Sequence, residues 1–266
     1  MENLINLFYL FRWWFLVTIN RYSNNSGANK NNNFTLSKEW DFTNTDFDSL
    51  ANDFRYSPPW GNKVNQRCSF KLDKRGIALT PEGATFTNII NPDGDSNETP
   101  FISGALVSKS NNYLPSFGKV SARYAIQRTE GNWCAFWTTD SKNTMPESDI
   151  VEFFGFKNGK RKLSPNTHYG TAYNSKKYKY QYHKSIYFPE KLNGRMLEWS
   201  AEFYPNKTIY KINNIPVYYT TRSCSTNEKV VWLNGGTWYD ATSDNVGESS
   251  RVEWLKYYSL VDVSKP

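Results

Sequence analysis

Three acidic side chains lie close together in the segment Glu147-Ser-Asp-Ile-Val-Glu152. On a regular β-strand the side chains at positions i and i+2 point to the same face, so Glu147 and Asp149 share one face. Glu152 would then point to the other face. One extra residue at Ile150-Val151, a β-bulge, would return Glu152 to the face of the other two acids. The spacing therefore predicts a bulged strand with three carboxyl groups on one side.

Three carboxylates on one strand face repel one another, which is hard to explain by a structural role alone. Two carboxyl groups about 5 to 5.5 Å apart, one ionised and one protonated, can cleave a glycosidic bond with retention of configuration. A third acid between them can share a proton and keep their pKa values apart. The structural alternative is a polar surface strand whose acids bind a cation or pair with lysine. The spacing alone leaves both interpretations open.

The elements that must position these acids are predicted to be strands. The chain of 266 residues contains 10 Trp, 18 Tyr and 17 Phe, and aromatic residues are enriched in strands. Arg251-Val-Glu-Trp254 and Thr208-Ile-Tyr-Lys-Ile212 alternate as half-buried strands do. Asn213-Asn214 suits a tight hairpin because asparagine tolerates positive φ. With no sustained helical periodicity after residue 20, we expect an all-β fold, an antiparallel sandwich or jelly roll.

The first 33 residues differ from the rest of the chain. Residues 4–19 are almost wholly apolar but shorter than the roughly 20 residues that a spanning helix needs, which favours a signal-like segment or an anchor. We divide the chain into a hydrophobic N-terminal segment (1–22), a polar linker (23–33) and one domain (34–266). The alternative for the first segment is an amphipathic arm packed on the domain. The division predicts an extracellular or cell-surface protein whose only membrane contact is through this segment.

Positive charge is concentrated in one part of the chain. The net charge is +7, and residues 157–191 contain nine basic residues against Glu190 alone, so this window carries +8 and the remainder −1. Such a segment can attract a polyanion, including a sulfated or carboxylated polysaccharide, or it can be a solvated loop. No nucleic-acid-binding motif accompanies the charge, so we do not expect nucleic acid as a partner.

Several other kinds of chemistry are disfavoured by the composition. The chain has two histidines, His168 and His183, and no C-x-x-C pair, which argues against a zinc centre. It also lacks a glycine-rich phosphate loop and a G-x-S-x-G nucleophile motif. Of its three cysteines, Cys134 is expected to be a buried thiol, and Cys68 and Cys224 could pair.

The residues around the acids resemble glycoside hydrolase family 16. That family carries G-x-W-P-A-F-W followed by E-[IL]-D-[IV]-x-E-x-x-G. This chain has Gly131-Asn-Trp-Cys-Ala-Phe-Trp137 followed by Glu147-Ser-Asp-Ile-Val-Glu-Phe-Phe-Gly155. Further segments that resemble the family's motifs, in the family's order, are Pro58–Asn62, Ser103–Lys109, Phe117–Arg123, Thr167–Gly170, Leu197–Trp199, Ile209–Val217, Trp232–Trp238 and Arg251–Tyr257. The resemblance covers nearly the whole predicted domain.

The resemblance implies a concanavalin-like β-jelly roll with a substrate groove and an endo-acting, retaining hydrolase of β-linked glucans or galactans. Carried over by position, Glu147 is the nucleophile, Asp149 the helper and Glu152 the acid/base. The E-x-D-x-x-E spacing is similar to that of laminarinases, agarases and carrageenases. Pro146 and Ser148 replace the family's usual Gly and Ile or Leu, which indicates a divergent member and puts the entry to the catalytic strand in doubt.

Sugar-binding side chains are expected near the acids, because a Trp ring can stack on the apolar face of a sugar. The candidates are Trp133 and Trp238 as sugar subsites, Trp60 and Asn62 at the non-reducing side, and His168 as a hydrogen-bond partner of substrate or acids. Trp137 is expected in the core. No cofactor is required, although the calcium ion common in the resembled family would have Asp41 and Glu253 as its candidate ligands.

The favoured partner is a polysaccharide of the β-1,3-glucan type, similar to laminarin, bound by a monomer. A sulfated or neutral galactan (carrageenan, agarose or porphyran) is one alternative, especially if the basic segment lines the groove. A second is a carbohydrate-binding jelly roll without catalysis, against which the three crowded acids argue. A third is a transglycosylase that uses a sugar in place of water as the acceptor.

Overall fold

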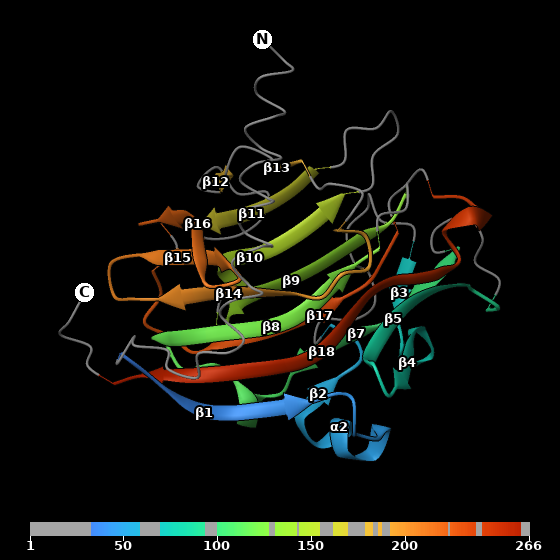
Figure 1. The fold of residues 1–266 in the computed structure, drawn as a ribbon, viewed down its shortest axis with the longest axis horizontal. Coiled ribbons are helices and arrows are strands. Elements are labelled where there is room, and N and C mark those ends of the chain that lie inside the picture. Colours follow the sequence, from blue (N-terminus) through green and yellow to red (C-terminus); the bar gives the residue numbers. More distant parts are fainter. Residues whose placement is uncertain are drawn as a thin grey trace, which may run out of the picture.

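Two large β-sheets dominate the computed structural model (Figure 1). The structure describes residues 33–58, 70–93, 100–127, 131–142, 144–154, 162–169, 179–182, 186–187, 192–222, 224–237 and 241–261. Within these ranges no helix has the length and apolar character needed to cross a membrane. The predicted N-terminal segment and nearly all of the predicted linker lie outside them, so that part of the domain division stays a prediction.

One sheet has ten strands in the order β16-β15-β14-β8-β18-β5-β6-β3, with β1 beside β18 and β4 beside β5. Its strands are β1 (Phe34–Asp41), β3 (Phe70–Leu72), β4 (Ile77–Thr80), β5 (Gly83–Ile90), β6 (Phe101–Ser103), β8 (Gly118–Ile126), β14 (Leu197–Phe203), β15 (Thr208–Ile212), β16 (Ile215–Thr220) and β18 (Gly247–Leu260). The pairs in this sheet are antiparallel except for β3 with β6, which is parallel.

The other sheet has eight strands in the order β12-β11-β10-β9-β17-β7-β2, with β13 beside β11. Its strands are β2 (Phe54–Arg55), β7 (Ala105–Ser108), β9 (Trp133–Asp140), β10 (Thr144–Phe154), β11 (Lys162–Tyr169), β12 (Lys179–Tyr182), β13 (Ile186–Tyr187) and β17 (Lys229–Asn234). Figure 1 shows the long strands of both sheets running alongside one another. The predicted all-β antiparallel sandwich is confirmed.

The main core lies between the two sheets, and a smaller apolar cluster lies on the opposite face of the eight-stranded sheet. Strand β17 supplies both, because Val231 and Leu233 point into the main core while Val230 and Trp232 join the smaller cluster. Side chains alternate between the two faces of a strand, so β17 is buried on both sides. The second face of this sheet is therefore partly covered, and it is the face that carries the site described below.

The predicted hairpin turn is present between β15 and β16. Asn213 and Asn214 both have positive φ, 49° and 64°, which is the conformation that a two-residue turn of this kind requires. Asn213 also accepts a hydrogen bond at Oδ1 from the backbone N–H of Glu198 at 3.0 Å, which ties the turn to β14.

We expect Asn214→Val to destabilise the protein by about 1–2 kcal/mol more than Asn214→Gly, as measured by urea denaturation. Both substitutions remove the same side-chain contacts, but only glycine adopts positive φ without steric cost. Equal losses in the two variants would show that the backbone conformation of this turn does not matter for stability.

The structure also contains short helical segments that the sequence patterns did not predict. These are α2 (Phe47–Asp53) and the 3₁₀ turns η1 (Lys74–Gly76), η2 (Ser110–Asn112) and η4 (Ser243–Asn245). Helix α2 begins at the cap Asp46, whose carboxylate accepts the backbone N–H of Ser49 at 2.7 Å. It buries one residue, Leu50, so it is too short to show a helical repeat in the sequence.

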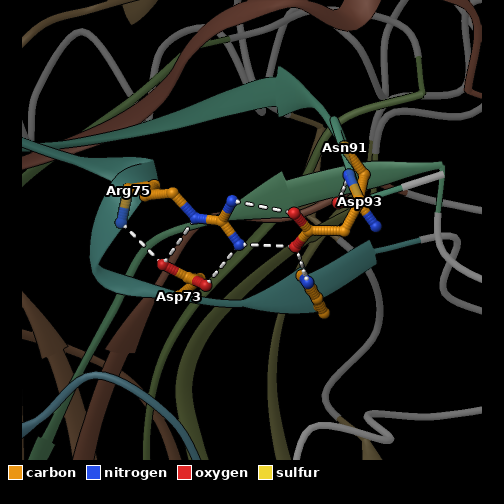
Figure 2. Close-up of polar contacts among 5 residues, drawn as sticks. Asp73, Arg75, Asn91 and Asp93 are labelled. Carbon is orange, nitrogen blue, oxygen red and sulfur yellow. Dashed lines mark hydrogen bonds and ion pairs between the residues drawn. The ribbon is translucent and has the colours of Figure 1, made fainter.

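An ionic cluster joins the turn after β3 to the connection after β5 (Figure 2). Arg75 Nη2 lies 2.8 Å from Asp73 Oδ2 and 2.8 Å from Asp93 Oδ2, and Lys71 Nζ lies 2.6 Å from Asp93 Oδ2. Hydrogen bonds from Arg75 and then Lys71 hold the pKa of Asp93 well below its usual range. Because these charges are partly exposed to solvent, we expect the cluster to fix the local position of β3 rather than add much global stability.

Candidate active site

The three acids of β10 lie on one face because the strand contains the predicted bulge. Towards β11, Asp149 pairs with Asn166 and Glu152 with Ser164, so two residues of β10 lie opposite a single residue of β11. Towards β9, the register shifts between Asp149 and Val151. The consecutive residues Ile150 and Val151 are both buried in the main core. The flanking carboxylates therefore point to the opposite face, and the predicted bulge is confirmed.

Pro146 lies at a second irregularity, at the start of the acidic segment. The pairing of β10 with β9 shifts between Thr144 and Glu147. Proline has no backbone N–H to donate to a neighbouring strand, so an interruption of the ladder at this position is expected. From Glu147 to Asp149 the pairing with β9 is regular again, and the replacement of the family's usual glycine leaves the carboxylates in register.

His168 lies beside the first two acids. Its Nε2 is 3.4 Å from Glu147 Oε1 and 3.3 Å from Asp149 Oδ2. The contact follows from the strand register, because His168 pairs directly with Glu147 across β10 and β11. Glu147 and Asp149 are 8% and 4% exposed. The structure therefore brings His168 to the acid pair, which is one of the two contacts expected from the sequence.

Glu152 is held by hydrogen bonds from both neighbouring strands. The indole Nε1 of Trp133 on β9 donates to Glu152 Oε1 at 3.0 Å, and the amide Nδ2 of Asn166 on β11 donates to Glu152 Oε2 at 3.1 Å. Burial first, and then the negative charge of Asp149, raise the pKa of Glu152 to about 8, while the two hydrogen bonds and His168 oppose the rise. A carboxyl group with this pKa is protonated at neutral pH and can donate a proton.

Asp149 lies between the other two acids and is the most deeply buried of the three. Burial raises its pKa above that of an exposed aspartate, and a hydrogen bond from Asn166 opposes the rise. Since Asp149 and Glu152 raise each other's cost of ionisation, both are not readily charged at the same time. One of the two groups, Asp149 or Glu152, can therefore hold a proton while the other is ionised.

Trp133 and Trp137 of β9 lie on the same face of the sheet as the acids. Trp137 pairs with Asp149 in the register of β9 and β10. Its ring stacks on that of Trp232, with the ring centroids 4.5 Å apart. Its indole Nε1 donates a hydrogen bond to Asn234 Oδ1 at 2.8 Å. Trp137 is partly exposed. Trp137 was expected in the core, and it does pack against the smaller apolar cluster, on the face of β9 that also faces the acids.

Trp133 is partly exposed, as the proposed role in sugar binding requires, but its N–H is directed to Glu152. Its ring lies against Phe70 of β3, with the centroids 5.6 Å apart. Gly236 allows this packing, since a Cβ at that position would lie 2.6 Å from the ring of Phe70 and 3.0 Å from that of Trp133. The backbone N–H of Trp133 also donates to the carbonyl of Gly236 at 2.9 Å.

Asn166 and Asn234 contact site residues and were not among the candidates from the sequence. For Asn166 a signal was present, because it lies two residues before His168 and the two side chains share a face of β11. Asn234 lies in the motif Trp232–Trp238 that resembles the family, but only the pairing of β17 with β9 shows that its side chain reaches Trp137.

Several predicted residues cannot be placed. Trp60, Asn62 and Trp238 lie outside the described residues, as do Cys68 and most of the basic segment 157–191. Cys134 is a buried free thiol, as predicted, and burial raises its pKa to about 12. Cys224 is a partly buried free thiol.

Asp41 and Glu253, the candidates for a calcium site, have other partners. Asp41 Oδ1 accepts hydrogen bonds from Thr43 at its backbone N and hydroxyl, at 2.9 and 2.6 Å. Glu253 lies 3.0 Å from the guanidinium of Arg123, which already balances its charge. These residues do not fit a ready calcium site. Within the described ranges, one group of three His, Cys, Asp or Glu side chains has ligand atoms close enough to share a cation, namely Glu147, Asp149 and His168, whose atoms lie within 4.8 Å of one another.

The bulged strand carries the acid pair Glu147 and Asp149 and, on the same face, the carboxyl group of Glu152 with its raised pKa. Glycoside hydrolases that use carboxyl groups for catalysis need one ionised and one protonated group of this kind. The sequence model of glycosyl hydrolases family 16 matches residues 61–256. The chain belongs to glycosyl hydrolases family 16 and is a glycoside hydrolase. No curated protein sequence matches it.

Solved structures with a similar fold include the following three. LamAcat from Zobellia galactanivorans has a TM-score of 0.68 and 16% identity, over 85% of this chain and 98% of that one. The endo-β-1,3-glucanase from Pyrococcus furiosus has a TM-score of 0.65 and 18% identity, over 86% and 95%. The family 16 protein of the Bacteroides ovatus mixed-linkage glucan locus has a TM-score of 0.63 and 18% identity, over 83% and 99%. The predicted jelly-roll sandwich is confirmed.

Proposed function

We propose that this glycoside hydrolase is an endo-acting, retaining β-glycanase whose substrate is a β-1,3-glucan of the laminarin type. The observation that carries the proposal is the bulged strand, which brings Glu147, Asp149 and Glu152 to one face, where burial raises the pKa of Glu152 to about 8. A retaining mechanism needs an ionised nucleophile and a protonated acid on one site.

In the first step, a carboxylate oxygen of Glu147 bonds to the anomeric carbon as the bond from that carbon to the departing sugar oxygen breaks. Glu152 gives its proton to the departing oxygen. Asp149 keeps a proton near the pair and, with His168, orients Glu147. The product of this step is a sugar esterified to Glu147, together with a shortened polysaccharide chain.

In the second step, the Glu152 carboxylate takes a proton from water while the water oxygen bonds to the anomeric carbon and Glu147 leaves. Two inversions give net retention. All of these steps use carboxyl groups of the chain, so the proposal includes no cofactor.

A polysaccharide is too large to enter a cell intact, and we propose accordingly that the protein acts outside the cell or at its surface. We further propose that it acts as a monomer.

The choice of β-1,3-glucan is supported by structures of similar fold. LamA from Z. galactanivorans has been crystallised with laminaritriose and laminaritetraose. The B. ovatus protein was crystallised with a mixed-linkage product, so a mixed-linkage β-glucan is a second candidate substrate.

We expect the full chain to lower the viscosity of laminarin faster than it releases reducing ends, and to act less on agarose or carrageenan. Cleavage at internal bonds lowers viscosity early, because a single cut near the middle halves the length of the chain but adds only one reducing end. Proton NMR of the first products should show the β-anomer before mutarotation. Binding without cleavage would support the non-catalytic alternative, and products longer than the starting chains would indicate transglycosylation.

A further inference from the structure

Asn166 lies beside Asp149 and Glu152, the two acids whose pKa values are raised. It is 5% exposed, it pairs with Asp149 in the register of β10 and β11, and its Nδ2 donates to Glu152 Oε2 at 3.1 Å. No hydrogen-bond donor in the described part of the chain reaches its Oδ1. A buried amide with an unpartnered oxygen has a cost in stability, so packing alone does not account for asparagine at this position.

The two oxygens of Glu152 are contacted by different strands. Trp133 on β9 donates to Oε1 and Asn166 on β11 donates to Oε2. An ionised carboxylate accepts both hydrogen bonds, whereas a protonated carboxyl group must direct its own hydrogen away from one of these donors or towards a substrate. The two N–H groups therefore favour the charged form of Glu152 and hold its plane relative to the strand.

We propose that Asn166 is a positioning residue for Glu152, which stabilises the carboxylate formed when Glu152 gives its proton to the departing sugar oxygen and orients it to take a proton from water. This inference rests on the proposed function. Asn166 touches neither the reacting bond nor the water in this account. It acts through the acids, directly on Glu152 and also on Asp149, whose pKa its hydrogen bond lowers.

Charged groups around Glu152 do not replace this contact. On its own strand, a charge on Asp149 opposes ionisation of Glu152, and Glu147 lies on the same strand face. From β11, His168 acts in the opposite direction. From β9, Cys134 has a pKa raised to about 12 and stays neutral at working pH. The Asn166 amide does not titrate, so its effect persists across the pH range in which the enzyme would work.

The test replaces Asn166 with leucine, which has a similar size and no N–H. In protein labelled with ¹³C at the glutamate carboxyl, the Glu152 signal is assigned by its loss in Glu152→Gln and titrated. We expect the pKa of Glu152 to rise by about one unit in Asn166→Leu. The alkaline limb of the pH–rate profile on laminarin should move by the same amount.

A second readout separates proton transfer from binding. We expect Asn166→Leu to lower kcat on laminarin about tenfold at the optimum, with a smaller loss on an aryl β-glycoside whose leaving group needs no proton. The KM for laminarin should change little, because Asn166 acts through Glu152. Asn166→Ser provides the same measurements with a smaller polar residue if the leucine variant does not fold.

Thr167→Val is the matched control. Thr167 is the next residue on β11, points to the other face and contacts the hydroxyl of Tyr210 at 2.8 Å, so its loss disturbs the strand without touching Glu152. An unchanged Glu152 pKa in Asn166→Leu, or an equal shift in Thr167→Val, would overturn the inference. If the wild-type chain cleaves no glucan, the proposed function fails, while the titration still decides whether Asn166 stabilises the Glu152 carboxylate.

Discussion

Glu147→Gln and Glu152→Gln are each expected to lower the release of reducing ends from laminarin by about 10³-fold or more, with the fold intact. Glutamine keeps the shape of the side chain but can neither attack the anomeric carbon nor donate and accept a proton as a carboxyl group does. Both residues are on β10 and glutamine has nearly the size and shape of glutamate, although at position 152 its single oxygen can accept from only one of the donors Trp133 and Asn166. Circular dichroism and thermal unfolding should therefore remain close to those of the wild type.

The roles of the two glutamates can be separated with an added anion. In Glu147→Ala, azide can take the place of the missing nucleophile, so we expect an α-glycosyl azide from an activated substrate. In Glu152→Ala, Glu147 still forms the ester and azide replaces water, so the product should be the β-glycosyl azide.

Glu253→Gln is the control for these variants, because Glu253 pairs with Arg123 on the ten-stranded sheet and lies away from the acids. Full activity is expected there. Retained hydrolysis in both Glu147→Gln and Glu152→Gln would reject the double-displacement mechanism, and exchanged azide products would mean that the two roles are reversed.

The position of the acids was predictable because their spacing permits few structures. Three carboxylates at E-x-D-x-x-E can share a face only if the strand contains one extra residue, and the structure has it at Ile150-Val151. The turn at Asn213-Asn214 was predictable for a similar reason, since few residues other than glycine accept positive φ at two successive positions.

The face on which each aromatic side chain lies was harder to predict. Strand β9 is buried on one side by the main core and partly covered on the other, so its hydrophobic pattern does not distinguish Trp137 from Phe136. Only the register with β10 shows that Trp137 is on the side of the acids. Asn166 could have been inferred from its place two residues before His168 on the same strand face, but its contact with Glu152 depends on the pairing of β10 with β11, which local sequence does not show.

The raised pKa values also predict how stability depends on pH. Burial raises the pKa of Glu152 from about 4.5 in an unfolded chain to about 8 in the folded protein, and burial raises that of Asp149 in the same direction. The folded state therefore binds these protons more tightly than the unfolded state. Their contribution to stability is fully present below about pH 4.5 and is lost as the pH rises towards and through 8.

We expect Glu152→Gln to be more stable than the wild type at pH 9 by about 2 kcal/mol, and close to it at pH 5. The glutamine is neutral at both values, so it avoids the cost of a buried charge that the wild type bears only in alkali. Urea denaturation at the two pH values measures this difference, with Glu253→Gln as a control whose difference from the wild type should not change between them. If the Glu152→Gln difference is the same at pH 5 and pH 9, Glu152 does not hold its proton in the folded protein, and its assignment as the proton donor would have to be withdrawn.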